Sequence, residues 1–503
     1  MNNLHTSIGI YLRRAEHLLW LPFISGILLA LTLPIFGLWP LIFVALIPII
    51  FFLTNTNLSR SRAVIGIFLT AFPCSFFVVL PLLGISGSWF DGGIDIFQGG
   101  VIGRLLFLPA VAVFGALLGA LFATPFFLAM RQQTIHGAIF AASLWVCSEI
   151  IRSTYLLFGF SGGVFGYALV DMPLISYAAR LPGGVLVLSF IIVYESICVV
   201  NLIRCIFLNE NKSVNIRFSL RNKRNAVYSA LFCIILLPLA GILYSRNSDC
   251  ATIPERVAVI SSDITTKDSI HPSAYAYFRA RIMQGVSGAA TIILLPENVF
   301  PFIELDEVTL RPSALGENYR PEYDVFYDDL LALSREYPST TIALGLHTIS
   351  GLDHYNSLVL IKNGAPYGIY HKEILVPFAE YAPSNPLLQF PSYEHLTAGS
   401  DNSSFLVNDI PTKGLICSEI FLYPTLNASP KLILSPSNDG VFSSQMAAKT
   451  HHSVAKMRAL ESGAYLLRSS KGGISSIIDP SGHVLAKATG DEVLFADIFP
   501  SCR

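Results

Sequence analysis

The first 250 residues contain about seven long apolar runs, which is the strongest constraint on what this chain can fold into. The runs cover residues 19–36, 38–53, 63–85, 103–129, 137–158, 184–207 and 226–244. A helix needs about 20 apolar residues to cross the ~30 Å hydrocarbon core of a bilayer. The pattern therefore predicts a membrane α-helical bundle of about seven transmembrane helices. A signal peptide is the alternative for the first run, but several further runs follow it.

The charges divide the chain at the same place. Residues 1–250 carry 15 Lys and Arg against 8 Asp and Glu, whereas residues 251–503 carry 18 against 26. The first half is apolar with basic connections, and the second is acidic and has the composition of a soluble domain. We therefore predict a transmembrane helical domain over 1–250 and a globular domain over 251–503. The net charge of -1 gives no electrostatic basis for binding nucleic acid.

Basic residues of the first half gather in alternate connections between the runs. They are Arg13 and Arg14, Arg60 and Arg62, Arg131, and the five from Lys212 to Arg224. Loop 86–100 has no Lys or Arg. Connections rich in Lys and Arg stay on the cytoplasmic side of a membrane. A cytoplasmic amino terminus followed by seven crossings places residues 251–503 outside the cytoplasm, which in a bacterium is the periplasmic side.

The second half alternates short apolar runs with longer segments of helical character. We predict strands at 256–261, 291–295, 341–345, 357–361, 413–416, 431–435, 464–469 and 474–478, and helices at 273–288, 322–336 and 444–462. Continuous apolar strands that alternate with helices are typical of an α/β domain whose sheets are covered by helices. We find no internal repeat.

Three reactive side chains follow predicted strands or lie near their ends. Glu297 follows the strand at 291–295, Lys372 lies in the segment Tyr370–Glu373, and Cys417 follows the strand at 413–416. A thiol is mostly protonated at its ordinary pKa of ~8.5, so a nucleophilic Cys needs a base or a nearby cation. Glu297 has the chemistry of such a base, and Lys372 that of an oxyanion stabiliser. Taken singly, each residue is more often structural or solvated, and spacing alone does not bring the three together.

The order of these motifs resembles the nitrilase superfamily and, within it, the family of bacterial apolipoprotein N-acyltransferases. The resemblance lies in Pro296-Glu297, in KEILVPFAEYAP from Lys372 to Pro383, in ICSEI around Cys417, and in Ser437-Asn438-Asp439. It continues in KMRALE from Lys456 to Glu461 and, in the first half, in ASLW at 142–145, Glu149, Arg152 and Phe165-Gly166-Tyr167. The likeness covers most of the chain.

This resemblance implies a nitrilase-like four-layer αββα sandwich for the second domain. It implies a Glu-Lys-Cys triad in which Glu297 is the general base, Lys372 the oxyanion stabiliser and Cys417 the nucleophile. Glu380 matches an additional glutamate that orients the site, and Glu419 and Asn356 match positions that line it. The implied reaction takes an acyl chain from a phospholipid onto Cys417 as a thioester. It then passes the chain to the α-amine of a diacylglyceryl-modified apolipoprotein at the bacterial inner membrane.

Two other functions stay open. Aromatic residues of the family are replaced here at Leu295, Ser418 and Gly440, which keeps open a membrane-tethered amidase or hydrolase that uses water as the acceptor. A non-catalytic, nitrilase-like membrane protein is the third possibility. We predict no cofactor. The chain has no C-x-x-C pair, and the adjacent His451 and His452 point to different faces of a helix, so we predict no metal site.

Overall fold

The computed structural model of the chain describes most residues of both halves. The described ranges are 19–79 (except 35 and 55–57), 109–125 (except 111 and 122), 135–153, 163–207 (except 173), 231, 235–244, 254–264, 273–313 (except 302), 322–381 (except 378), 395–400, 405–421, 430–441 and 445–499. The chain divides into two compact units. The described residues up to Tyr244 belong to the first unit, and those from Pro254 onward belong to the second.

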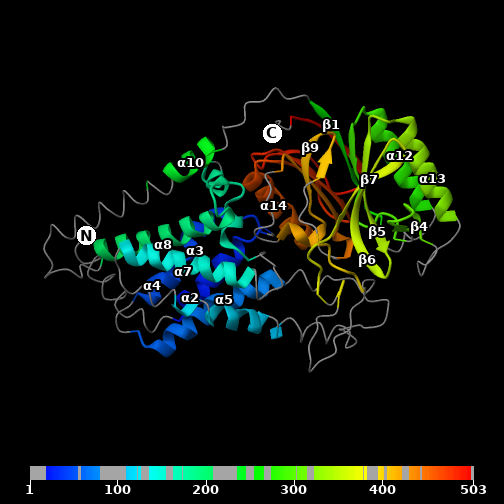
Figure 1. The fold of residues 1–503 in the computed structure, drawn as a ribbon. Coiled ribbons are helices and arrows are strands. Elements are labelled where there is room, and N and C mark those ends of the chain that lie inside the picture. Colours follow the sequence, from blue (N-terminus) through cyan, green and yellow to red (C-terminus); the bar gives the residue numbers. More distant parts are fainter. Residues whose placement is uncertain are drawn as a thin grey trace. The chain divides into compact units, whose positions relative to one another are not determined.

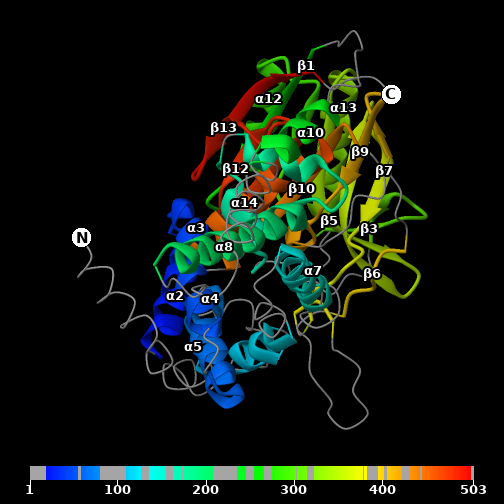
Figure 2. The same cartoon turned by 90° about the vertical axis from the view of Figure 1, so that its left-hand side faces the viewer.

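The first unit is helical. Its α-helices are α2 (Trp20–Leu31), α3 (Ile42–Ala45), α4 (Ile47–Leu53), α5 (Arg60–Val79), α7 (Ile135–Ile151), α8 (Val185–Phe207) and α10 (Leu237–Tyr244). Short 3-10 helices are η2 (Trp39–Leu41), η6 (Phe165–Leu169) and η7 (Ile175–Arg180). Helix α2 packs against both α4 and α5, and these helices lie together in Figure 2.

Two described helices are long and apolar enough to cross a membrane, judged by length and composition. They are Arg60–Val78 and Val185–Arg204. The run 38–53 is divided among η2, α3 and α4, and proline stands in the first turn of both η2 and α4. Proline has no N–H to donate and so favours a helix start over a helix interior. The seven crossings remain a prediction, and Arg13, Arg14, loop 86–100 and the loop from Lys212 to Arg224 lie outside the described residues.

Two ionisable side chains in and just after α7 bind the backbone that follows this helix. The Phe165 N–H donates to Glu149 Oε1 at 3.0 Å, and Arg152 Nη2 donates to the Gly163 carbonyl at 2.9 Å. Glu149 is buried. A polar group inside an apolar helical unit is costly unless it is bonded. These two bonds give both side chains a structural task inside the first unit.

The second unit contains two β-sheets. The first has eight strands, in the order β14-β1-β2-β5-β3-β4, with β6 and β7 added on the other side of β5. Its strands are β1 (Glu255–Ser261), β2 (Ile292–Leu294), β3 (Glu304–Asp306), β4 (Arg311–Pro312), β5 (Thr341–Ser350), β6 (Asp353–Lys362), β7 (Ala365–His371) and β14 (Glu492–Ile498). Strands β1, β2 and β5 run parallel, so their carboxyl ends lie at one edge.

The second sheet has six strands in the order β13-β12-β11-β10-β9-β8. They are β8 (Phe405–Val407), β9 (Ile410–Gly414), β10 (Leu432–Asn438), β11 (Tyr465–Lys471), β12 (Ser475–Ile478) and β13 (Val484–Ala488). Strands β9, β10 and β11 are parallel. A parallel bridge between Ser262 and Lys471 joins the carboxyl ends of β1 and β11, and the Gly472 N–H donates to the Ser262 carbonyl at 2.7 Å.

The helices complete four layers. One apolar core lies between the first sheet and helices α12 (Ser273–Ser287) and α13 (Glu322–Glu336). A second core joins the two sheets, and α14 (Gln445–Ser462) packs on the second sheet. Figure 1 shows α12 and α13 on one side of the sheets and α14 on the other. The second unit therefore has the predicted αββα order.

Every predicted strand and helix of the second half overlaps an observed one, although the predicted strand at 413–416 shares only its first two residues with β9. The sequence interpretation missed β3, β4, β7, β8, β13 and β14. These strands are short or carry half-exposed residues, as the burial of β13 and β14 illustrates. An edge strand of this kind lacks the continuous apolar run of a strand buried on both faces.

Candidate active site

Glu297 stands in a detour of the chain along one edge of β5. Strands β2 and β3 both pair in parallel with β5, at residues 341–343 and 347–349 respectively, and residues 295–303 connect them. Between the two pairings, a Cβ built on Gly345 would lie 2.5 Å from the Glu297 Cα. Glycine therefore lets β5 pass directly under the turn. The Gly345 N–H donates to the Pro296 carbonyl at 3.1 Å, which fixes the position of Glu297.

Lys372 follows β7 and is buried with its partner. Its Nζ donates to Glu380 Oε1 at 2.7 Å, and Glu380 Oε2 accepts the Val376 N–H at 2.6 Å. Burial alone would lower the pKa of Lys372, but the nearby carboxylates of Glu380 and Glu297 raise it above the ordinary value. Lys372 therefore remains a cation and cannot serve as the base.

Asn356 on β6 connects the two carboxylates. Its Nδ2 donates to Glu297 Oε1 at 2.8 Å and to Glu380 Oε1 at 3.2 Å. Its backbone carbonyl accepts the Lys372 N–H at 2.8 Å. Asn356 thus fixes the two carboxylates through its side chain and Lys372 through its backbone.

Cys417 lies three residues after the end of β9, at the first residue of the 3-10 helix η9 (Cys417–Phe421). Its φ of 50° is in the left-handed region, which a non-glycine residue adopts only under constraint. Leu415 and Ile416 are buried, whereas Cys417 is partly exposed and unpaired with another cysteine. Burial and the nearby Glu297 carboxylate raise the pKa of the Cys417 thiol, while Lys372 opposes the rise. The thiol is therefore protonated at rest and needs a base to become a nucleophile.

One cavity brings these residues together. It contains about 500 Å³ of space, part of it open to solvent, and its walls include Glu297, Asn356, Lys372, Glu380 and Cys417. We call these five residues the pocket cluster. The Oε2 atom of Glu297 is buried and has no hydrogen-bond partner among the described residues. An unbonded carboxylate oxygen in the wall of a cavity that also exposes a thiol is an arrangement suited to proton transfer.

Glu419 lies beside the cavity rather than among the described residues that line it. Its carboxylate accepts the Ile416 N–H at 2.7 Å, the Glu373 N–H at 2.7 Å and the Tyr370 hydroxyl at 3.1 Å. It therefore ties the segment before Cys417 to the segment that carries Lys372. Burial raises the pKa of Glu419 to about 7, and Lys372 and the backbone N–H groups oppose this rise.

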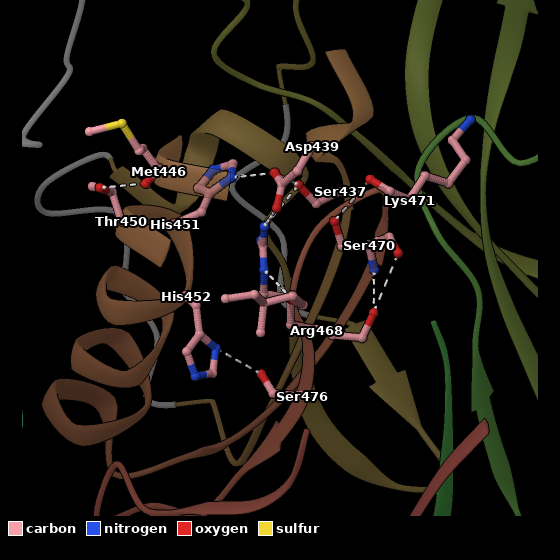
Figure 3. A network of polar contacts seen from close by, with 12 residues as sticks. Ser437, Asp439, Met446, Thr450, His451, His452, Arg468, Ser470, Lys471 and Ser476 are labelled. Atoms are coloured by element: carbon pink, nitrogen blue, oxygen red, sulfur yellow. Dashed lines mark hydrogen bonds and ion pairs between the residues drawn. The ribbon is translucent and has the colours of Figure 1, made fainter. Parts of the chain in front are cut away.

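A second group of buried polar residues surrounds Asp439, which directly follows β10. The Asp439 cluster consists of Ser437, Asp439, His451 and Arg468 (Figure 3). Asp439 Oδ1 accepts the Ser437 hydroxyl at 3.1 Å and lies 2.7 Å from His451 Nδ1, and Asp439 Oδ2 accepts Arg468 Nη2 at 2.7 Å. Burial would raise the pKa of Asp439, but Arg468 and His451 hold it below its ordinary value. His452 is not part of this cluster, and its Nδ1 lies 3.2 Å from the hydroxyl oxygen of Ser476.

Comparison with known families agrees with this geometry. Residues 25–198 match the model of the apolipoprotein N-acyltransferase N-terminal domain, and residues 279–502 match the carbon-nitrogen hydrolase model. The two matches follow each other in one chain, and curated apolipoprotein N-acyltransferases align along most of its length. The chain belongs to the apolipoprotein N-acyltransferase family.

Two curated relatives illustrate the extent of the likeness. The apolipoprotein N-acyltransferase of Haemophilus influenzae is 27% identical over 491 residues, which are 92% of this chain and 85% of that protein. The apolipoprotein N-acyltransferase of Pseudomonas syringae is 26% identical over 500 residues, 95% of this chain and 90% of that protein. The alignments therefore include both units.

Solved structures from the nitrilase superfamily align with half of the chain. An amidase from Nesterenkonia AN1 has 15% identity and a TM-score of 0.37, and covers 50% of this chain and 93% of that chain. Nit3 of Saccharomyces cerevisiae has 16% identity and the same TM-score, coverage of this chain and coverage of its own chain. The nitrilase-like fold of this apolipoprotein N-acyltransferase family member follows from the carbon-nitrogen hydrolase match and the two-sheet architecture.

Three further residues enter the site that the sequence interpretation did not predict as site residues, although Asn438 belongs to one of its motifs. His347 and Asn438 line the cavity, and Lys471 lies behind the turn that carries Glu297. Asn438 and Lys471 end the neighbouring parallel strands β10 and β11, at the same edge as Cys417. The signal used for Cys417, a polar residue that ends an apolar strand, applies to both of them as well.

Proposed function

We propose that this protein transfers an acyl chain from a phospholipid to the α-amine of a diacylglyceryl-modified apolipoprotein, through a thioester on Cys417. The observation that carries the proposal is the meeting of Cys417, Glu297 and Lys372 in one cavity, in a chain of the apolipoprotein N-acyltransferase family. We assign Glu297 as general base, Lys372 as oxyanion stabiliser and Cys417 as nucleophile. Glu380, Asn356 and Glu419 position them.

The first half-reaction acylates the enzyme. Glu297 Oε2 takes the proton of the Cys417 thiol as the sulfur forms a bond to the ester carbonyl carbon of the phospholipid. The ammonium group of Lys372 stabilises the negative charge that develops on the carbonyl oxygen. The ester C–O bond then breaks, and the lysophospholipid leaves with the proton that Glu297 held. The products are the thioester and a neutral lysophospholipid alcohol.

The second half-reaction regenerates the thiol. The uncharged α-amine of the acceptor forms a bond to the thioester carbonyl carbon while Glu297 takes one amine proton. The C–S bond breaks, and the sulfur recovers a proton from Glu297. The product is an amide, and two modest acyl transfers replace one difficult transfer.

An intact-mass experiment tests this proposal directly. The full chain in detergent is mixed with palmitoyl phosphatidylethanolamine, and we expect one palmitoyl group to be added and then released by hydroxylamine. Cys417→Ala should show no adduct, whereas Cys147→Ala, which removes another exposed thiol, should behave like the parent. An adduct that persists in Cys417→Ala, or no adduct in the parent, would contradict the proposal.

The acceptor is tested in a second step. A diacylglyceryl-cysteine lipopeptide with a free amine should discharge the isolated thioester, and its N-acetylated counterpart should not. Release of free fatty acid at the same rate with either peptide would favour a hydrolase. A chain that binds phospholipid without forming any adduct would favour a non-catalytic role.

We also propose that residues 1–250 form seven crossings of a bacterial inner membrane and that residues 251–503 lie on the periplasmic side. The alternation of basic connections supports this orientation. Val308, which is 84% exposed in the turn between β3 and β4, provides a labelling position in the second unit. Val308→Cys should react with a membrane-impermeant maleimide in whole cells, and Lys212→Cys only after lysis. The reverse pattern would overturn the orientation.

A further inference from the structure

The positive charges near Glu297 determine how readily its carboxylate stays ionised. Lys372 gives its short contact to Glu380, and Arg468 gives its contact to Asp439. In the part of the chain that the structure describes, the side-chain hydrogen bond that Glu297 accepts comes from Asn356, which is neutral. Two buried carboxylates, Glu297 and Glu380, thus share the ammonium group of Lys372, and a buried negative charge without a matching positive charge is costly to keep ionised. A base that must be ionised at rest therefore needs positive charge from another residue.

Lys471 is placed to supply that charge. It ends β11, its side chain is completely buried, and its Nζ donates to the backbone carbonyl of Asn298 at 2.7 Å. Asn298 is the next residue after Glu297 and has a φ of 44°, in the left-handed region that asparagine adopts more readily than other non-glycine residues. In Figure 3 the Lys471 side chain points away from Asp439 and Arg468. It is therefore separate from the Asp439 cluster, although its strand also carries Arg468.

The turn of Glu297 is held from two sides. Gly345 on the first sheet bonds to the backbone of Pro296 and Val299, and Lys471 on the second sheet bonds to Asn298 between them. Burial lowers the pKa of Lys471 to about 8, and the field of Glu297 opposes this fall. The two side chains thus interact electrostatically across the turn, in addition to the hydrogen bond.

We propose that Lys471 is a positioning residue for Glu297: its ammonium group holds the turn that carries the carboxylate and supplies the positive charge that keeps it ionised. This inference rests on the proposed function of Glu297 as the base for Cys417. The nearby groups that share this field are Lys372, Glu380, His347, Cys417 and His451. Burial lowers the pKa of both histidines, so they are neutral near pH 7.

The test measures the rate of Cys417 palmitoylation across about pH 5 to 9, a range that spans the ordinary titration of His and buried carboxyl groups. The variants are Lys471→Met, which removes charge and hydrogen bond, Lys471→Gln, which keeps a donor without charge, and Lys471→Arg, which keeps the charge. Lys362→Met is the matched control, because Lys362 donates to Asn408 at 2.6 Å in another part of the first sheet.

We expect the acid limb of the rate profile to move to higher pH by about one unit in both neutral variants, because the carboxylate loses a stabilising positive charge. On the acid limb itself the rate should fall roughly tenfold, because a shift of one unit changes the ionised fraction about tenfold there, whereas well above the limb the rate should change little. Lys471→Arg should keep the acid limb of the parent, and Lys362→Met should match the parent throughout.

Each alternative outcome has a distinct meaning. If the parent is acylated and Lys471→Gln keeps its acid limb, Lys471 has only a structural task and the inference is wrong, whether or not Lys471→Met folds. A lower rate with an unmoved limb has the same consequence. A parent that never forms the adduct overturns the proposed function, and this inference falls with it.

Discussion

The pocket cluster and the Asp439 cluster each contain a buried ion pair, but their carboxylates differ in hydrogen bonding. In the Asp439 cluster, both carboxylate oxygens are bonded, one to Ser437 and His451 and the other to Arg468. In the pocket cluster, Glu297 Oε1 is bonded to Asn356, while Oε2 has no partner among the described residues. The Asp439 carboxylate is stabilised as an anion, whereas Glu297 keeps one oxygen available to take a proton.

The two clusters differ in their access to a cavity, although both are largely buried. Asp439 and Arg468 are 1% and 0% exposed, and Lys372 of the pocket cluster is also 1% exposed. The pocket cluster lines a cavity with an opening to solvent. A buried ion pair with every oxygen bonded is expensive to break but does no chemistry by itself. We therefore expect substitutions in the two clusters to change different observables.

The largest effect is expected for Glu297→Gln. Glutamine keeps the shape and an oxygen to accept the Asn356 bond, but it cannot take the Cys417 proton. Loss of a general base lowers a rate by ~10²–10⁴-fold, so the palmitoyl adduct should form that much more slowly. Intact-mass spectrometry of timed samples measures this rate, and the melting temperature should stay close to that of the parent.

Glu255→Gln is the matched control, because Glu255 accepts a hydrogen bond from Thr291 at the start of β1. It should leave the adduct rate unchanged. An adduct rate in Glu297→Gln within a few-fold of the parent would assign the base to another group and remove the functional difference between the clusters.

The next effect is on stability and concerns Asp439→Asn. The neutral amide leaves the fully buried Arg468 guanidinium without its counter-charge. Breaking one partner of a buried ion pair costs about 3–5 kcal/mol. For a domain of this size that corresponds to a fall of roughly 6–20 °C in melting temperature, measurable by scanning calorimetry on the full chain in detergent.

Asp497→Asn provides the comparison. Asp497 pairs with Arg256 at 3.1 Å, and both side chains are about half exposed. A surface pair of this kind contributes at most about 1 kcal/mol, so its melting temperature should hardly change. Equal losses in the two variants would mean that the Asp439 cluster is not the structural anchor that its bonding indicates.

Individual residues illustrate how far the sequence predicts this arrangement. Cys417 and Glu297 each follow an apolar strand, and this local signal by itself predicts that both lie at sheet edges. The five-residue convergence depends on sheet register and on the passage of β5 beneath the turn at Gly345, which no local pattern encodes. The Asp439–Arg468 pair joins residues 29 positions apart, at the end of β10 and on the adjacent β11, so it follows from register as well.

The two units also differ in how well apolar runs of the sequence predict their elements. In the second unit, short apolar runs correspond to strands because each is buried between a sheet and a helix layer. In the first unit, run length alone predicts seven crossings, but prolines interrupt the run 38–53, and two described helices reach full length. Hydrophobicity therefore predicts the environment of these segments better than it predicts their continuity as helices.

The smallest effect is a dependence of stability on pH that we assign to His452. Burial, together with the positive charge of Arg468, lowers the pKa of His452 to about 3, from an ordinary value of 6.5. The folded state therefore binds this proton more weakly than the unfolded state, so stability is lost as the pH falls below 6.5. Between pH 6.5 and 5 the loss amounts to about 2 kcal/mol, at 1.36 kcal/mol per unit.

His452→Gln should remove that part of the pH dependence, because glutamine has no proton to gain. Because of this residue, the melting temperature of the parent should be roughly 4–8 °C lower at pH 5 than at pH 6.5. In the variant, the fall in melting temperature between the two pH values should be smaller by the same amount. Thermal melts of both proteins at the two pH values measure the difference. His483→Gln, a change in the turn between β12 and β13, serves as the control. If His452→Gln and the parent lose the same stability on acidification, the buried histidine does not contribute, and the acid sensitivity of the second unit has another source.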